Sequence, residues 1–168
     1  LLTTSAAIRT ICLHDRDAAG RARRDVGYGP PGDKPVRRRV MENRLFHYDE
    51  DILIHAVGLW LDAKRRRPFS FVSHAHGDHM TRHERVLATP ATIALGNERH
   101  EHKRSTQKRP RARKPQQETP LEFGKKLRLD GTAVTLFPAG HILGSAQILI
   151  EHDGRRLLYS GDFCPDKT

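Results

Sequence analysis

The chain has 168 residues, enough for one domain with a hydrophobic core, and its composition excludes several classes of protein. No apolar run reaches the roughly 20 residues of a transmembrane helix, and the first residues lack the pattern of a signal peptide, so we expect no membrane association. Two cysteines, Cys12 and Cys164, fit a reducing compartment, and we expect a cytoplasmic protein without a disulfide framework.

Thirty Lys and Arg against twenty Asp and Glu give a formal net charge of +10. This charge suits a polyanionic partner such as nucleic acid, because neutralised phosphates release condensed counterions. A solvated basic surface with basic tails would have the same composition, so both interpretations stay open at this point.

The first 40 residues differ in composition from the rest of the chain. They hold nine Lys and Arg, four Asp and Glu, and a Gly-Tyr-Gly-Pro-Pro-Gly stretch, without sustained hydrophobic periodicity. Such a segment buries too little apolar surface to offset the entropy of ordering. We therefore expect residues 1–40 to form a disordered basic segment and residues 41–168 to form the folded domain.

The domain begins with runs that are typical of strands. Asp51–Asp62 and Phe69–Ser73 are rich in β-branched and aromatic residues, and the basic stretch 64–68, which ends in proline, separates them. The apolar run Val86–Thr89 predicts a short buried strand.

A short helix is predicted next, over Ala91–Glu98, with Thr89 as its N-cap and Pro90 at the first helical position. Residues 97–118 then contain eight Lys and Arg, three Glu and no large apolar residue, which predicts a solvated loop. A mobile charged loop is the favoured interpretation. The other is a nucleic-acid contact, for which the candidates are Arg109, Arg111, Arg113 and Lys114.

Two β-hairpins follow, each marked by Asp-Gly between alternating runs, which is the strongest short-range hairpin signal. The predicted strands are Lys126–Leu129, Ala133–Phe137, Ala146–Glu151 and Arg155–Ser160, with turns at 130–131 and 153–154. The order of elements predicts an α/β fold of mixed β-sheets with flanking helices.

Four ligand-type side chains lie within six residues directly after a predicted strand: His74, His76, Asp78 and His79. The His-x-His spacing places two imidazoles on one side of an extended backbone. Gly77 is expected to let the chain bend so that the last two side chains face a second position. Imidazole and carboxylate suit zinc, and two zinc ions about 3.5–4 Å apart could activate one water for a displacement.

Two further candidate ligands each follow a later predicted strand. His141 lies in Pro-Ala-Gly-His, and Asp162 lies in Ser-Gly-Asp, so small residues flank both and allow the backbone to approach a metal closely. Each residue alone fits an ordinary turn, but together with the first cluster they indicate a metal site.

These motifs resemble those of the metallo-β-lactamase superfamily, specifically its nucleic-acid-processing branch with the β-CASP insertion. The resemblance covers about residues 45–166 and is greatest to exonucleases described as mRNA 3′-end processing-factor-like or DNA-ligase-associated. It rests on Leu-Trp-Leu-Asp at 59–62, Ser-His-Ala-His-Gly-Asp-His at 73–79, Ala-Gly-His-Ile-Leu-Gly-Ser-Ala at 139–146 and Tyr-Ser-Gly-Asp-Phe at 159–163.

The resemblance implies the N-terminal half of an αββα sandwich with two zinc ions. One zinc would be bound by His74, His76 and His141. The second would be bound by Asp78 and His79, with Asp162 bridging both. Asp78 would orient the attacking water or take its proton. Asp62 would orient the site, although an ordinary strand-end turn would also place an Asp there.

Further His and acidic motifs of this family, and its β-CASP cap, would come after Thr168. We therefore interpret the sequence as the N-terminal portion of such a domain, with an open sheet edge and an uncovered apolar face. The leading functional hypothesis is a zinc-dependent nuclease, an exonuclease acting on RNA or DNA, with an RNA-processing or DNA-repair partner as a further expectation. The alternatives are a hydrolase of small thioesters, lactones or lactams, and an inactive truncated product.

Overall fold

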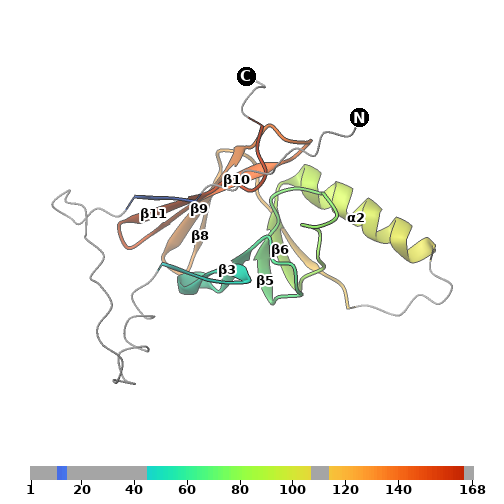
Figure 1. Ribbon diagram of the computed structural model, residues 1–168, viewed down its shortest axis with the longest axis horizontal. Helices are drawn as coiled ribbons and strands as arrows, with labels where there is room; N and C mark the ends of the chain where they lie inside the picture. The colour runs from blue at the N-terminus through green and yellow to red at the C-terminus, as the bar shows by residue number, and fades with distance from the viewer. Residues whose placement is uncertain (1–10, 15–44, 107–113, 165–168) are drawn as a thin grey trace.

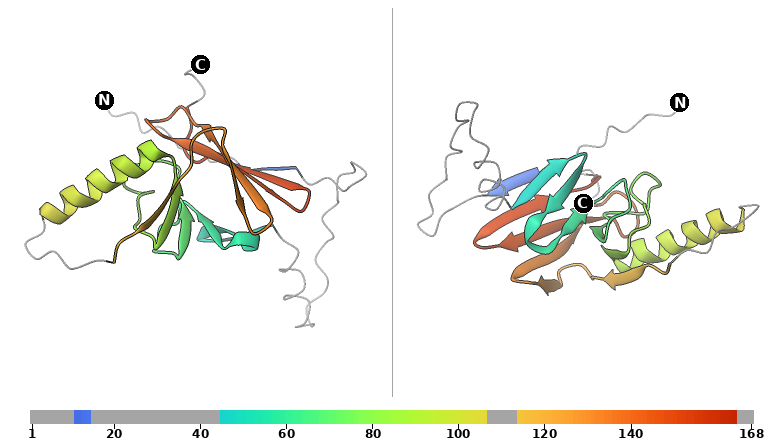
Figure 2. Two further views of the ribbon diagram at one scale, coloured as in Figure 1. Left: turned by 180° about the vertical axis from the view of Figure 1, so that it is seen from behind. Right: turned by 90° about the horizontal axis from the view of Figure 1, so that it is seen from below.

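Two facing β-sheets and a helix make up the computed structural model, which describes residues 11–14, 45–106 and 114–164 (Figures 1 and 2). The first sheet is antiparallel, in the order β1-β11-β10-β9-β8. Its strands are β1 (Ile11–His14), β8 (Lys126–Leu129), β9 (Thr132–Pro138), β10 (Ala146–His152) and β11 (Arg155–Tyr159).

The second sheet is mixed and has six strands in the order β2-β3-β4-β5-β6-β7. Its first three strands pair antiparallel, and the pairs from β4 to β7 are parallel. The strands are β2 (Phe46–Asp49), β3 (Asp51–Ile54), β4 (Leu59–Leu61), β5 (Phe69–Phe71), β6 (Arg85–Ala88) and β7 (Gln117–Pro120), and a 3₁₀ turn, η1 (His55–Val57), lies between β3 and β4.

The main hydrophobic core fills the space between the sheets. Strand alternation builds it: in β10, for example, Ile148 and Ile150 are fully buried, whereas the residues between and after them are partly exposed. A smaller apolar cluster, which contains Val72, Val86 and Ile93, packs the helix α2 (Pro90–Ser105) against the other face of the mixed sheet. No helix of the described residues has the length and apolar character of a membrane span.

Most predicted strands are confirmed. Both Asp-Gly hairpins form, as β8–β9 and β10–β11, and the predicted strand at 86–89 is β6, which ends at Ala88. The run Asp51–Asp62 is two strands instead of one, because Gly58 takes a left-handed conformation (φ +60°) and turns the chain between them. The result is a mixed α/β architecture, as expected.

The helix prediction was right at the start of α2 and wrong at its end. Thr89 caps α2 by accepting a hydrogen bond from the Thr92 amide at 3.2 Å, and Pro90 occupies the first turn. The helix continues to Ser105, seven residues past the predicted end at Glu98, into the segment expected to be a loop. Glu, Lys and Arg favour helix, and basic residues near the C-terminus interact well with the helix dipole, so an exposed extension needs no apolar face.

The expectation of disorder for residues 1–40 lies outside the described residues except at Ile11–His14. There the structure has β1, which pairs antiparallel with β11, with Ile11 opposite Tyr159. This strand was not expected from the sequence. It extends the antiparallel sheet because the edge of β11 offers free backbone groups to a short apolar segment.

Candidate metal centre

The candidate ligands meet where the two sheets join. Asp62 directly follows β4, and the segment 74–79 follows β5, so the carboxyl ends of two parallel strands bring them to the same edge. The Ala146 amide donates to the Ser73 carbonyl at 2.8 Å, which ties the start of β10 to the end of β5. His141 in the β9–β10 loop and Asp162 after β11 come to this junction from the antiparallel sheet.

Three imidazole nitrogens converge. His74 Nε2 lies 3.0 Å from His76 Nδ1, and His141 Nε2 lies 3.1 Å from the same His76 atom. Tetrahedral zinc with bonds of about 2.0–2.1 Å needs ligand nitrogens about 3.3 Å apart, so small adjustments would seat an ion among these rings. The three residues could therefore hold one metal ion.

A second group lies beside the first. His74, His79 and Asp162 offer ligand atoms that all lie within 4.8 Å of one another. The Asp162 Oδ2 atom is 3.8 Å from both His74 Nε2 and His79 Nε2 and 4.0 Å from His141 Nε2. Asp162 thus faces both groups of histidines, which is the position of a bridging ligand.

Asp78 lies at the rim of this centre. Its carboxylate is 73% exposed, and its Oδ2 atom lies 3.4 Å from His79 Nε2. The expected ligands therefore come together, with Asp78 on the solvent side, where a substrate or water can reach it.

Asp62 lies beneath the ligands as a buried acceptor. Its Oδ1 atom accepts from the Ser73 amide at 2.7 Å, and its Oδ2 atom accepts from the hydroxyls of Ser73 at 2.6 Å and Tyr159 at 2.9 Å. Oδ2 also lies 3.0 Å from His79 Nδ1. Asp62 has φ +45°, a conformation that Asp tolerates better than most residues.

The electrostatics of the centre follow from burial and from Asp62. Burial lowers the pKa of His74 to about 4, assisted by the nearby His79, so this ring is neutral and able to bind metal. Burial also acts to lower the pKa of His79, but the hydrogen bond and charge of Asp62, with Asp78 and Asp162, raise it overall. For Asp62, burial acts to raise the pKa, yet His79 and Ser73 hold it below its usual value.

The loop that carries His141 is held from two sides. Ser145 Oγ accepts the His141 amide at 3.0 Å, and Thr89 and Thr92 at the start of α2 donate to the Gly144 carbonyl at 2.7 and 2.9 Å. A Cβ on Gly144, which has φ +79°, would lie 2.8 Å from the Thr92 nitrogen. The sequence predicted Thr89 only as a helix cap and gave no supporting role to Ser73, Ser145 or Tyr159. The place of these last three within the motifs is the one signal that could have indicated them.

The role expected for Gly77 needs correction. Its φ lies outside the left-handed region, and the bend at 76–80 is a turn in which the amides of His79 and Met80 donate to the His76 carbonyl. A Cβ on Gly77 would instead meet Arg99, whose Nη2 atom would be 2.6 Å away. Glycine here leaves space for the Arg99 guanidinium and is not needed for backbone conformation.

The remaining predicted residues lie elsewhere. Arg109, Arg111 and Arg113 are outside the described residues, and Lys114 is exposed. His83, which matched no motif, is buried, and its Nδ1 atom accepts the Arg67 amide at 3.2 Å, so its role is structural.

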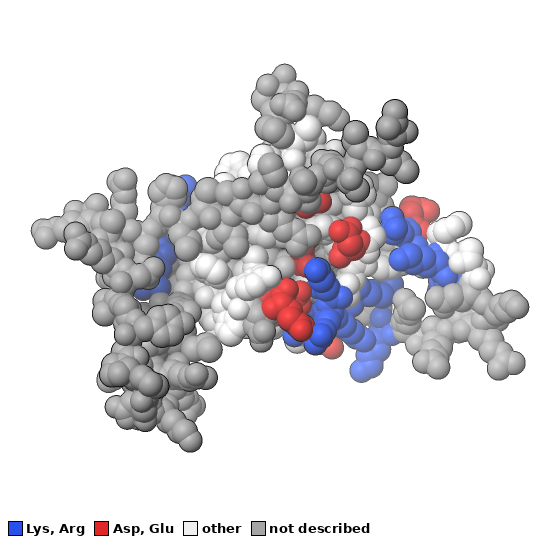
Figure 3. Space-filling model, in the orientation of Figure 1, with Lys and Arg blue, Asp and Glu red and all other residues white. Residues whose placement is uncertain are grey.

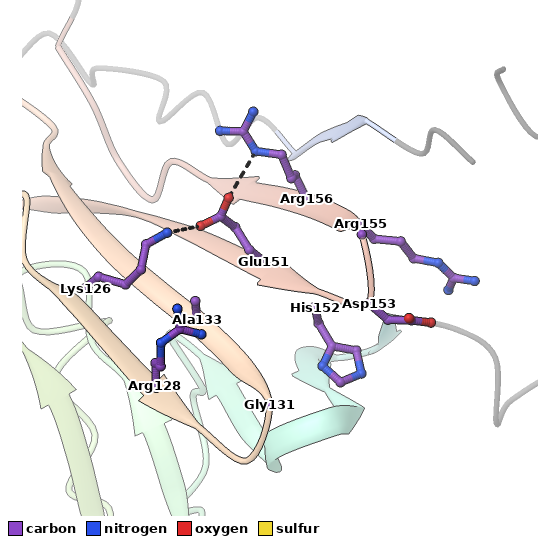
Figure 4. Close-up of a pocket in the computed structure, with 10 residues that line it drawn as sticks. Lys126, Arg128, Gly131, Ala133, Glu151, His152, Asp153, Arg155 and Arg156 are labelled. Carbon is purple, nitrogen blue, oxygen red and sulfur yellow. Dashed lines mark hydrogen bonds and ion pairs between the residues drawn. The ribbon is translucent and has the colours of Figure 1, made fainter. Parts of the chain in front are cut away.

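A hollow of about 300 Å³ lies at the opposite end of the antiparallel sheet, by the hairpin turns (Figure 4). Its basic side chains surround Glu151, which pairs with Lys126 at 2.8 Å and with Arg156 at 3.6 Å. The candidate ligands come from the other end of β10 and take no part in this hollow.

Comparison with known proteins agrees with the motifs. No family model matches the chain. Over 118 residues, 69% of its length, the chain is 41% identical to a probable DNA ligase of Opitutus terrae. Over 43 residues, 26% of its length, it is 46% identical to a ribonuclease of Thermus thermophilus and 44% identical to cleavage and polyadenylation specificity factor subunit 3 of Dictyostelium discoideum.

The matched segments make up 10%, 10% and 6% of these proteins, so the chain spans about a tenth or less of the relatives it matches. These similarities, to a probable DNA ligase, a ribonuclease and a cleavage factor subunit, agree with the resemblance that the motifs indicated.

Proposed function

We propose that this chain carries the two-zinc centre of a metallo-β-lactamase-fold nuclease of the β-CASP branch, which hydrolyses phosphodiester bonds of RNA or DNA as an exonuclease. The observation that carries the proposal is the convergence of His74, His76 and His141, from loops 65 residues apart, at nitrogen–nitrogen distances of 3.0–3.1 Å. The similarity to a ribonuclease and to a cleavage factor subunit favours nucleic acid over a small ester or lactam as the substrate.

The donor set fits zinc. It consists of imidazoles and carboxylates without thiolates, a combination that zinc hydrolases use in open catalytic sites. In this proposal His74, His76 and His141 would hold one ion, and Asp78 and His79 would hold the other. Asp162, whose Oδ2 atom faces both groups, would be a ligand shared between them.

Hydrogen bonds behind the ligands determine which ring nitrogen of each histidine is free to bind metal. The Ser73 hydroxyl donates to Asp62 and so accepts from His74 Nδ1–H, which leaves the His74 Nε2 lone pair for metal. Asp62 likewise accepts from His79 Nδ1–H and directs His79 Nε2 toward the centre. Asp62 is therefore a positioning residue, because it acts through Ser73 and His79.

Bound zinc would supply Lewis acidity and make water nucleophilic near neutral pH. Asp78 contributes the proton acceptor: its exposed carboxylate lies beside His79, where it can orient the attacking water and take its proton. The basic residues of the chain, with a net charge of +10, would favour the approach of a polyanion.

End-labelled RNA and DNA oligonucleotides test this function with the zinc-loaded chain. We expect zinc-dependent cleavage that Asp78→Asn slows by about 10²-fold or more. Asp153→Asn is the matched control, since Asp153 lies in a hairpin turn (φ +47°) that Asn tolerates equally. Hydrolysis of small esters or lactams without cleavage of nucleic acid would contradict the proposal in favour of a small-substrate hydrolase. Inertness toward both would favour a non-catalytic product.

A further inference from the structure

Helix α2 packs directly on the loop that carries the ligands. Two glycines allow this contact: a Cβ on Gly96 would lie 2.1 Å from Met80 Cε, and a Cβ on Gly77 would lie 2.6 Å from Arg99 Nη2. Gly96 and Arg99 are three residues apart and so share one face of the helix. The guanidinium of Arg99 therefore lies against the backbone between His76 and Asp78.

The positive charge of Arg99 is not used within the described part of the protein. Its side chain is exposed, and the structure gives it no ion pair with another described residue. The neighbouring Glu101 instead lies 3.8 Å from Arg104. In Figure 3, basic side chains gather over α2, whose C-terminal half projects away from both sheets in Figure 1.

We propose that Arg99 binds a backbone phosphate of the nucleic-acid strand, next to the phosphate that is cleaved. This inference rests on the proposed function. An exposed guanidinium offers paired N–H donors that match phosphate oxygens. The Arg99 guanidinium lies against Gly77, at the side of the ligand loop, so it is placed to bind a phosphate that flanks the reacting one.

Binding and turnover measured on the zinc-loaded chain separate this role from others. For Arg99→Ala we expect the Kd for an uncleavable phosphorothioate oligonucleotide to rise about tenfold, and the salt dependence of log K to fall by about one. Hydrolysis of bis(p-nitrophenyl) phosphate, which has no flanking phosphate, should be unchanged, as should the zinc content. Arg99→Lys should recover part of the binding, because it keeps the charge but loses the paired donors.

Arg104→Ala is the matched control, since it removes an exposed charge from the same helix five residues further from the ligand loop. We expect less than a twofold change in Kd. Equal weakening by Arg99→Ala and Arg104→Ala would overturn the inference in favour of general charge attraction. No weakening by Arg99→Ala would overturn it outright. A loss of zinc or of small-diester turnover would show that Arg99 supports the centre itself.

Gly77→Ala provides an independent test of the Arg99 contact. A methyl group there must displace the Arg99 guanidinium, the end of a flexible side chain, while the backbone needs no change. We expect oligonucleotide binding to weaken as in Arg99→Ala, and the double variant to be no weaker than Arg99→Ala alone. Additive losses would contradict the contact. If the unchanged chain does not bind the oligonucleotide, the proposed function itself fails, and the inference fails with it.

Discussion

Substitution of Asp62 by Asn tests whether this buried carboxylate organises the metal centre. Asn keeps the size of the side chain and tolerates the left-handed backbone (φ +45°) at this position. It removes the negative charge and replaces one acceptor oxygen by an NH₂ group. If that group takes the place of Oδ2, it faces the Ser73 and Tyr159 hydroxyls and His79 Nδ1. If it takes the place of Oδ1, it faces the Ser73 amide.

In either orientation the new NH₂ group faces groups that donate hydrogen bonds to Asp62 in the unchanged chain. Hydrogen bonds to a charged acceptor contribute about 1.5–3 kcal/mol each, and the hydroxyls can partly compensate by turning to accept. We expect Asp62→Asn to lower the free energy of unfolding by about 2–4 kcal/mol. We also expect zinc affinity to fall about 10–100-fold, because His79 and His74 lose the partners that orient their rings. Chemical denaturation of the metal-free chain and zinc titration measure the two effects separately.

Asp51 provides the control, since it is as buried as Asp62 and lies in the same sheet. It accepts from the Lys64 amide at 3.1 Å and from Arg67 Nη2 at 2.8 Å, and it contacts no candidate ligand. Asp51→Asn should lower stability while leaving zinc affinity unchanged. Unchanged zinc affinity in Asp62→Asn, or an equal loss in Asp51→Asn, would refute the positioning role.

Three further predictions follow from other contacts. Burial lowers the pKa of His83 to about 4, so below pH 6.5 protons bind the unfolded chain preferentially, and the free energy of unfolding should fall by about 3 kcal/mol as the pH drops from 6.5 to 4. His83→Asn should remove that part of the pH dependence. The same dependence of unfolding free energy on pH in the variant and the unchanged chain would contradict this prediction. Gly144→Ala should displace the His141 loop and weaken zinc binding, whereas Gly124→Ala, with φ +71° and open space around it, should cost only about 1 kcal/mol of stability. Zinc at 100 times its Kd should raise the free energy of unfolding by about 2.7 kcal/mol, and chelator or His141→Ala should abolish the gain. A thermal denaturation midpoint that does not change when zinc is added would exclude a zinc site in the folded chain.

Local patterns were enough to predict most of the candidate site and much of the sheet structure. The Asp-Gly turns, the alternation in β10 and the cap at Thr89 each depend on a few neighbouring residues, so they could be recognised without knowledge of the fold. The candidate ligands could be recognised because each follows a strand, where a short polar segment has no packing role of its own.

Tertiary structure decided which residues support those ligands and what the glycines are for. Tyr159 reaches Asp62 across 97 residues, and α2 meets Gly77 through Arg99, 22 residues further along the chain. The predicted bend at Gly77 forms, but Gly77 does not have a left-handed φ, and a Cβ there would meet the side chain of Arg99. Such contacts depend on how two sheets and a helix pack together. Residues that are distant in the chain show no local sequence pattern from which their contact could be predicted.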